Sequence, residues 1–393
     1  MLIREKYLSR IRPYYDSELI KVLTGIRRSG KSTILKQIIS EVNNKGAKII
    51  FFDFEDYLNE KYLNNPDEFY NNLIQMIDFE QKTYIFLDEI QNMDDFQKVI
   101  ASIRKMNCSL FVTGSSSKLL SGELASVLTG RVIEFSIQPF SYSEASEYMG
   151  REDDDLFLDY LKFGGFPLRY IESSTDPFLF SKNLYEAILE RDIFSRHHIE
   201  DKNKFRNFAS YVMLHSGEII STESIDKFTT NIGDKISKST GYQYLDYMEE
   251  AFFNRCCLRY DVSGKQMLNT KKKYYASDVS LIRVQKNSDN QNLGFFLETI
   301  VFNELISRGL TVSIGKTYKG EVDFVVSSEK GLCYIQVCYL LATEEIIERE
   351  FGAFSCIRDS YPKYVLSMDK IDMSRNGIKH INIRDFLLSK VLF

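Results

Sequence analysis

The sequence predicts an α/β protein whose N-terminal part is a parallel β-sheet with helices on both faces. Three observations support this class. A glycine-containing phosphate-binding loop stands between an apolar strand and an amphipathic helix, strands and helices then alternate, and an acidic pair closes a later apolar strand. This alternation is typical of doubly wound sheets, which bind ligands at the carboxyl ends of their strands.

The composition is that of a multidomain globular protein. The chain has 393 residues, which at roughly 150 residues per domain suggests two or three domains. Hydrophobic residues make up 44% and charged residues 27%, and no run approaches the roughly 18 apolar residues of a membrane span. The N-terminus lacks the apolar segment of a secretory signal, and the six cysteines show no paired metal spacing. We therefore expect a cytoplasmic protein with free thiols and no membrane association.

Residues 25–32 match the pattern G-x-x-x-x-G-K-[ST], known as Walker A, at every fixed position. The loop N–H groups and the N-terminus of the following helix suit phosphate binding. We expect Lys31 to reach the β- and γ-phosphates of ATP and the Ser32 hydroxyl to coordinate Mg²⁺. The loop residues expected to contact the nucleotide are Gly25, Ile26, Arg27, Arg28, Ser29, Gly30, Lys31, Ser32 and Thr33.

The strand at 84–87 ends in Asp88 and Glu89, which fits the Walker B half of an ATPase signature. Asp88 is expected to hold Mg²⁺, and Glu89 is expected to orient and polarise the attacking water. An acidic pair at a strand end can also cap a helix. About sixty residues after a full phosphate loop, the catalytic interpretation is favoured.

Two further positions are candidates for roles in ATP hydrolysis. Residues 110–117 predict another core strand, which ends in hydroxyl side chains. Ser115, with Thr113 as the other candidate, either contacts the γ-phosphate or the attacking water, or caps the next helix. Arg131 opens the strand at 132–137. It is either an arginine finger that stabilises transition-state charge, on its own nucleotide or on a neighbour's, or a surface ion-pair residue.

Together these segments resemble the AAA-type P-loop ATPases of bacteria and archaea that carry a C-terminal domain of unknown function. The segments that carry the resemblance are GIRRSGKST, IFLDEIQ, FVTGSSS, LTGRV and PFSYSEA, followed by Phe163–Pro167 and Glu190–Ile193. The last two are similar to the family's lid and connector. The resemblance covers nearly the whole chain and implies an ATPase core at 1–139 and a helical lid and connector at 140–203.

Residues 204–286 predict three helices followed by a β-hairpin, the order of a winged helix-turn-helix, and the resemblance implies the same. The helix that starts near Ser237 would be the recognition helix. Residues 235–273 hold eight Lys/Arg and four Asp/Glu, a local net charge of +4 in a chain whose net charge is −5. This asymmetry favours contact with DNA phosphates, and the alternative is a protein-interaction module.

Residues 287–393 resemble the restriction-endonuclease-like α/β core, with Glu298 and Asp323 at acidic positions. That nuclease chemistry needs a further acidic ligand and a lysine two residues after it. Gln336 and Cys338 stand there instead, and neither supports the chemistry. We expect a degenerate site without cleavage, unless Lys316 or Lys319 supplies the ammonium.

The sequence therefore leaves three functional hypotheses. The first is an Mg²⁺-dependent ATPase that couples nucleotide state to its C-terminal modules. The second is a slow nucleotide-gated DNA-binding or signalling switch, and the third and weakest is an Mg²⁺-dependent nuclease. Expected ligands are ATP and Mg²⁺, and expected partners are DNA or another protein, in an oligomeric state that the sequence leaves open.

Overall fold

The computed structural model describes residues 2–78, 80–104, 106–120, 130–172, 176–232, 236–286, 294–329 and 331–389. The chain divides into two compact units. The first unit comprises Met1–Gln138 with Glu250–Phe252, and the second comprises Pro139–Glu249 with Phe253–Phe393. Residues 287–292 are polar and read as a linker in the sequence, and they lie outside the described residues.

The first unit is built on a five-stranded sheet with the strand order β2-β3-β4-β1-β5. All four strand pairs are parallel, so every carboxyl end meets the same edge. The strands are β1 (Ile20–Thr24), β2 (Lys48–Asp53), β3 (Thr83–Asp88), β4 (Cys108–Gly114) and β5 (Val132–Ser136). β4 lies between β1 and β3, which places the start of the phosphate loop one strand away from the acidic pair.

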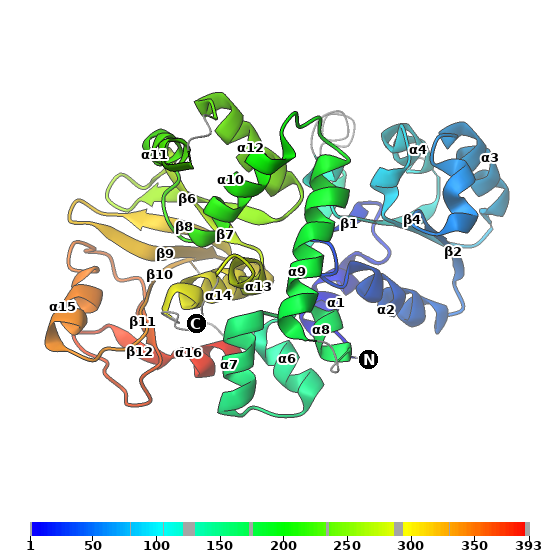
Figure 1. The fold of residues 1–393 in the computed structure, drawn as a ribbon. Coiled ribbons are helices and arrows are strands. Elements are labelled where there is room, and N and C mark those ends of the chain that lie inside the picture. Colours follow the sequence, from blue (N-terminus) through cyan, green and yellow to red (C-terminus); the bar gives the residue numbers. More distant parts are fainter. Residues whose placement is uncertain are drawn as a thin grey trace. The chain divides into compact units, whose positions relative to one another are not determined.

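Helices cover both faces of this sheet (Figure 1). The helical elements are α1 (Glu5–Ile11), η1 (Arg12–Tyr14), α2 (Lys31–Asn43), η2 (Tyr57–Tyr62), α3 (Pro66–Met76), η3 (Ile90–Asn92), α4 (Phe96–Ile103) and η4 (Ser117–Leu120). Helices α1 and α2 pack on one face, and α3 and α4 pack on the other.

The strands supply both cores because successive side chains point to opposite faces. In β1, Val22 belongs to the core under α3 and α4, whereas Leu23 belongs to the core under α1 and α2. In β3, Leu87 and Phe86 divide in the same way. A strand buried on both faces reads as a continuous apolar run, which is why these strands are visible in the sequence.

One charged residue interrupts β1. Lys21 is 0% exposed, and its amino group donates hydrogen bonds to the Ser17 carbonyl at 3.0 Å and to the Ser109 hydroxyl at 2.7 Å. The amino group also lies 4.6 Å from the centre of the Phe111 ring. Burial, with a smaller contribution from the nearby charge of Lys82, lowers the pKa of Lys21 to about 7.

This lysine should make stability depend on pH. An unfolded lysine keeps a pKa of about 10.4, so between about pH 7 and pH 10 the unfolded chain binds more protons than the folded one, and folding becomes more favourable as pH rises. From pH 7 to pH 9 we expect wild type to gain roughly 2 kcal/mol relative to Lys21→Met. Urea unfolding followed by circular dichroism measures this, with exposed Lys36→Met as the control. Equal pH dependence in wild type and Lys21→Met would contradict the prediction.

The second unit begins with a series of helices. They are α6 (Tyr142–Met149), α7 (Asp154–Phe163), α8 (Pro167–Ile171), α9 (Pro177–Ile188), the π-helical η5 (Leu189–Phe194), α10 (Lys202–Leu214), α11 (Thr222–Ile232) and α12 (Lys238–Glu250). The hairpin β6 (Asn254–Asp261) and β7 (Gln266–Ala276) follows α12. Helices α10 to α12 and this hairpin occur in the order expected for residues 204–286.

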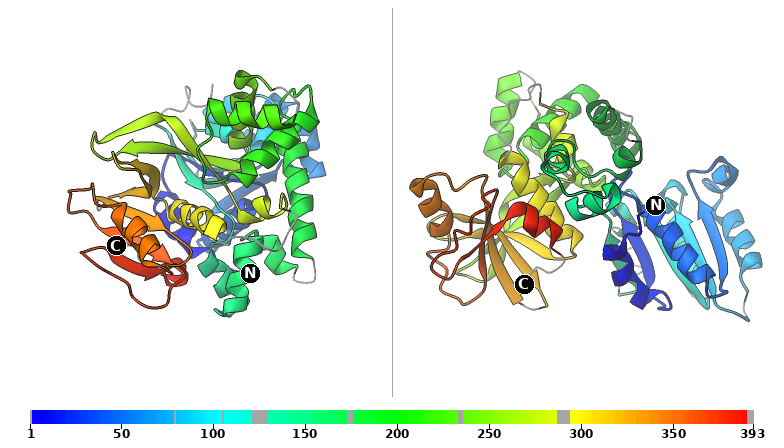
Figure 2. Two further views of the ribbon diagram at one scale, coloured as in Figure 1. Left: turned by 60° about the vertical axis from the view of Figure 1, so that its left-hand side comes forward. Right: turned by 90° about the horizontal axis from the view of Figure 1, so that it is seen from below.

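The hairpin does not stand alone, because β6 pairs in parallel with β8. The result is a seven-stranded sheet with the order β12-β11-β10-β9-β8-β6-β7. In the left view of Figure 2 the yellow-green hairpin continues into the gold and orange strands. The remaining elements are α13 (Val279–Arg283), α14 (Gly294–Ser307), β8 (Thr311–Lys316), β9 (Glu321–Ser328), β10 (Gly331–Val337), α15 (Glu344–Gly352), β11 (Lys363–Ser367), β12 (Lys379–Asn382) and α16 (Ile383–Leu388).

The predicted α/β class and the parallel sheet of the N-terminal part are confirmed. Among the described residues, no helix has both the length and the apolar character needed to cross a membrane.

Candidate nucleotide-binding site

The phosphate loop connects β1 to α2, and two glycines shape it. Gly25 has φ 145° and Gly30 has φ 98°, values that residues other than glycine rarely adopt. A Cβ atom built at Gly25 would lie 2.1 Å from the backbone oxygen of Ile137. The loop can therefore pass this close to the chain beyond β5 only because residue 25 has no side chain.

Lys31 occupies the first turn of α2 and is 4% exposed. Its Nζ donates hydrogen bonds to the carbonyls of Gly25 at 3.0 Å and Ile26 at 3.3 Å. The same atom lies 3.4 Å from Oε1 of Glu89. The ammonium thus connects the two ends of its own loop to the acidic pair after β3.

Thr113 on β4 holds both acidic residues in place. Its hydroxyl donates a hydrogen bond to Oδ1 of Asp88 and accepts one from the Glu89 backbone N–H at 2.9 Å. Glu89 has φ 51° and ψ 44°, a left-handed conformation that is uncommon outside glycine and is often found at functional sites. Of the two hydroxyls expected near the nucleotide, Thr113 is the one that contacts Asp88.

The electrostatic surroundings differ between the two carboxyls. Burial raises the pKa of Asp88, and the nearby charges of Glu89 and Asp53 add to this, while hydrogen bonds from Thr113 and Ser32 act in the opposite direction. Burial alone would also raise the pKa of Glu89, but the charge of Lys31 and the hydrogen bond from Gln91 bring it below its usual value. Glu89 is therefore ionised at neutral pH.

Gln91 is a site residue for which the sequence predicted no role, although it ends the segment IFLDEIQ. Its Nε2 donates hydrogen bonds to Oε2 of Glu89 and, at 3.4 Å, to the hydroxyl of Ser115. Its Oε1 is buried and has no hydrogen-bond partner among the described residues. Gln91 thus connects Ser115 to Glu89 and leaves one acceptor available. Its position two residues after Glu89 is the sequence feature that could have indicated this role.

The remaining loop residues lie around this centre. Ile26 is buried, and Arg27 forms an ion pair of 3.0 Å with Glu55, just beyond β2. Arg28 has φ 65°. Thr33 is in the first turn of α2 and is partly buried.

Arg131 is not brought to this centre. It immediately precedes β5, whose parallel register pairs Ile20 with Val132 and Thr24 with Ser136. Arg131 is therefore at the amino end of the strands. At a rise of about 3.3 Å per residue, it lies about 20 Å along the strand direction from the phosphate loop. This geometry is incompatible with a finger acting on the nucleotide of its own chain. Action on a neighbouring chain's nucleotide stays a prediction.

The residues expected to hold Mg²⁺ fit a small divalent cation in their chemistry. A hydrogen bond from the Ser32 hydroxyl reaches the Asp88 carboxylate, so two oxygen donors lie within reach of one ion, and oxygen donors are what Mg²⁺ prefers. The described part of the chain contains no cluster of three or more His, Cys, Asp or Glu side chains arranged to hold a metal. Two protein ligands are sufficient, because Mg²⁺ usually keeps several waters and phosphate oxygens.

The nuclease-like positions in the second unit are occupied by internal contacts. Lys273 on β7 contacts Glu298 at 3.3 Å and Glu321 at 2.6 Å. Asp323 accepts a hydrogen bond from the Val337 N–H at 2.8 Å, and burial raises its pKa well above the usual value.

The ammonium beside these carboxyls therefore comes from Lys273. The alternative in which Lys316 or Lys319 supplies an ammonium stays a prediction. Gln336 accepts a hydrogen bond from the Asp323 N–H at 3.2 Å, and burial raises the pKa of Cys338 to about 12.

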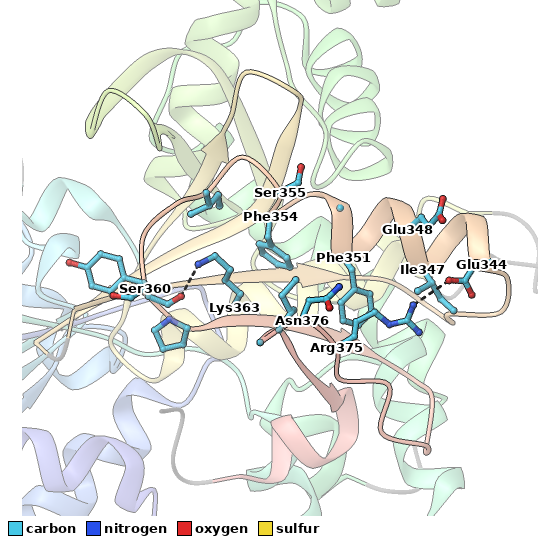
Figure 3. Close-up of a pocket in the computed structure, with 16 residues that line it drawn as sticks. Glu344, Ile347, Glu348, Phe351, Phe354, Ser355, Ser360, Lys363, Arg375 and Asn376 are labelled. Carbon is cyan, nitrogen blue, oxygen red and sulfur yellow. Dashed lines mark hydrogen bonds and ion pairs between the residues drawn. The ribbon is translucent and has the colours of Figure 1, made fainter.

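A separate cavity of about 770 Å³ lies in the C-terminal part, between α15 and the segments around 360 and 376 (Figure 3). Three of its charged groups already have partners, since Arg375 lies 3.3 Å from Glu344 and Lys363 donates to the carbonyls of Asp359 and Tyr361. The lining thus indicates no ligand class.

Comparisons with known proteins identify the family of the segment that carries this site. Residues 17–146 match the family described as an AAA domain, and residues 154–292 match a domain of unknown function, DUF8612. An uncharacterized protein of Haemophilus influenzae is 31% identical over 402 residues, covering 99% of each chain. The uncharacterized protein MJ1544 of Methanocaldococcus jannaschii is 31% identical over 396 residues, covering 93% of this chain and 85% of the relative.

Two solved structures show weaker likeness. The Orc1 protein of Aeropyrum pernix in complex with DNA is 12% identical with a TM-score of 0.32, covering 72% of this chain and 92% of that one. AMPPCP-bound DnaA from Aquifex aeolicus is 12% identical with a TM-score of 0.34, covering 64% and 90%. At these TM-scores neither likeness carries weight for this chain. The assignment to a family rests on the match to the AAA domain and on the relatives aligned over nearly the whole chain. The chain belongs to the AAA-type P-loop ATPases that carry a C-terminal domain of unknown function.

Proposed function

We propose that this protein binds ATP and hydrolyses it with Mg²⁺. The observation that carries the proposal is the convergence of Lys31, Ser32, Asp88 and Glu89 at one edge of the parallel sheet, with Thr113 between the strands. A structural ion pair alone would explain Lys31 and Glu89. It would not explain the glycine conformations of the loop or the contact between Ser32 and Asp88.

Each residue of the site has a distinct role in this reaction. The loop N–H groups and the start of α2 bind the phosphates, and Lys31 neutralises the β- and γ-phosphate oxygens. Ser32 and Asp88 would hold Mg²⁺, which supplies further positive charge to those oxygens when it is bound. Glu89 is ionised and accepts the proton of the attacking water, while Gln91 and Thr113 fix its position.

Binding of nucleotide must rearrange one contact. The Lys31 ammonium has three donors, and in this structure it contacts two carbonyls and Glu89. A triphosphate competes for the same ammonium, so its arrival releases Glu89 from the ion pair and frees the carboxylate to act on water. The resting pair therefore keeps both charges compensated while no nucleotide is bound.

The test is phosphate release measured against protein concentration, with and without Mg²⁺ and with and without DNA. Hydrolysis that requires Mg²⁺ supports the proposal, and the absence of ATP binding would refute it. A rate per chain that rises with concentration is expected if Arg131 acts on a neighbour. In that case Arg131→Ala lowers the rate without changing ATP affinity.

DNA binding by the second unit is a second candidate function. The observation that favours it is that Ser237, Lys238 and Ser239 at the start of α12, and Lys265 and Lys271 on the hairpin, are exposed. Two of the basic residues of this region are compensated. Exposed Lys238 lies 3.1 Å from Asp226, and Lys273 is buried in its ion pairs. The surface is thus less basic than the residue count suggests.

Electrophoretic shift assays between roughly 50 and 200 mM salt test this candidate, because phosphate contacts make affinity fall with salt. The double variant Lys265→Glu/Lys271→Glu should weaken any shift, and the exposed Lys36→Glu in the first unit is the control. No shift at low salt rules the candidate out.

The same DNA incubated with Mg²⁺ tests the nuclease alternative, which predicts nicking that Asp323→Ala abolishes.

A further inference from the structure

Arg4 is a buried arginine that precedes α1 and lies outside the region matched by the AAA domain. It is 2% exposed. Its guanidinium donates one hydrogen bond to the Ser29 carbonyl at 2.8 Å and another to the Gln138 carbonyl at 3.0 Å. The guanidinium carbon also lies 4.6 Å from the centre of the Tyr7 ring. One planar cation therefore joins the phosphate loop to the chain that follows β5.

The contact with Ser29 bears directly on phosphate binding. The peptide unit between Ser29 and Gly30 is planar and trans, so its C=O and N–H groups point in opposite directions. Arg4 holds the Ser29 oxygen on the buried side, which directs the Gly30 N–H to the opposite side. Gly30 immediately precedes α2, so this N–H adds to those that the helix N-terminus offers to an anion.

The arginine is itself fixed by its neighbours. Its backbone N–H donates to Oε1 of Gln37 on α2 at 3.3 Å, and the Gln37 amide donates to the Leu2 carbonyl at 2.6 Å. The Tyr7 hydroxyl accepts a hydrogen bond from the Gln138 N–H at 3.1 Å. The N-terminal segment, α2 and the end of the first unit thus hold the guanidinium against the loop.

We propose that Arg4 is a positioning residue for nucleotide binding, which keeps the Ser29–Gly30 peptide in the orientation that accepts a phosphate. The proposal rests on the proposed ATP binding and goes beyond it. Arginine suits this role because its planar fork of donors reaches two carbonyls at once, whereas lysine presents a compact charge. Without the guanidinium the peptide can rotate, and the loop must be reordered at each binding event.

The experiment compares wild type with Arg4→Met and Arg4→Lys. Isothermal titration gives the Kd for ATP and ADP, steady-state kinetics give KM and kcat, and circular dichroism gives Tm. Arg4→Met removes the bonds to both Ser29 and Gln138. We expect it to raise Kd and KM about tenfold, the worth of the charge-assisted hydrogen bond to the Ser29 carbonyl, with a smaller change in kcat. The Kd and KM of Arg4→Lys should lie between those of Arg4→Met and wild type.

The matched control is Arg308→Met. Arg308 also donates to a backbone carbonyl, that of Phe386 at 2.8 Å, but it belongs to the C-terminal part of the second unit. Its replacement should lower Tm without changing Kd for ATP. A merely structural role for Arg4 predicts the same behaviour for both arginines.

The outcomes separate the two proposals. If wild type binds ATP and a folded Arg4→Met binds it with the same Kd, Arg4 has no positioning role. If Arg4→Met does not fold, Arg4→Lys decides, because unchanged Kd and KM in that variant overturn the inference. If wild type binds no ATP, the proposed function itself fails, and the positioning role fails with it.

Discussion

Replacement of Glu89 by Gln is expected to lower kcat for ATP hydrolysis by about 10² to 10⁴-fold, the usual contribution of a general base. Binding should persist. The amide keeps the shape and the Gln91 contact, and removal of a negative charge beside the phosphates leaves ATP affinity equal to or higher than that of wild type. Single-turnover phosphate release together with a binding titration measures both effects.

The control for this variant is Glu60→Gln, which removes an exposed carboxylate of the same unit and should leave kcat unchanged. Hydrolysis at the wild-type rate in Glu89→Gln would show that another group activates the water. Loss of ATP binding in Glu89→Gln would instead assign Glu89 to the binding of nucleotide.

Replacement of Lys31 by Ala is expected to weaken ATP binding by about two to three orders of magnitude. A unit charge pair 4 Å apart near a protein surface is worth about 4 kcal/mol, and every 1.4 kcal/mol is about tenfold. Phosphate release should become undetectable. Lys36→Ala removes the same kind of charge from an exposed position of α2 and should bind ATP like wild type.

The Lys31 variant also leaves the buried Glu89 carboxylate without its ion-pair partner, which can destabilise the fold. The double variant Lys31→Ala/Glu89→Gln separates the two effects. It should recover thermal stability relative to Lys31→Ala while ATP binding remains lost. Recovery of ATP binding in the double variant would mean that Lys31 acts only by compensating Glu89.

The sequence predicted the parts of the site that depend on local spacing. Residues 25–32 need glycine at positions 25 and 30, where φ is 145° and 98°. Asp88 ends a strand that is buried throughout, and Glu89 follows it. Parallel strands then bring both segments to one edge, because all carboxyl ends meet there. These constraints act over a few residues, so a single sequence is sufficient to show them.

Contacts between distant segments were not predictable in this way. Arg4 resembles the other arginines near the N-terminus until the fold buries it against Ser29, 25 residues away. Arg131 sits beside a core strand in the sequence, but the register of β5 places it at the far end of the sheet. Lys273 looks like part of a basic hairpin until the sheet turns it towards Glu298 and Glu321.

The pairing of β6 with β8 has a practical consequence for dividing the chain. A fragment that stops at residue 286 would keep the hairpin but lose β8, leaving β6 with a row of exposed N–H and C=O groups. Such an edge readily recruits strands from other molecules. Expression of the helices and hairpin by themselves should therefore yield aggregates, and a fragment meant to stay monodisperse has to extend through β12.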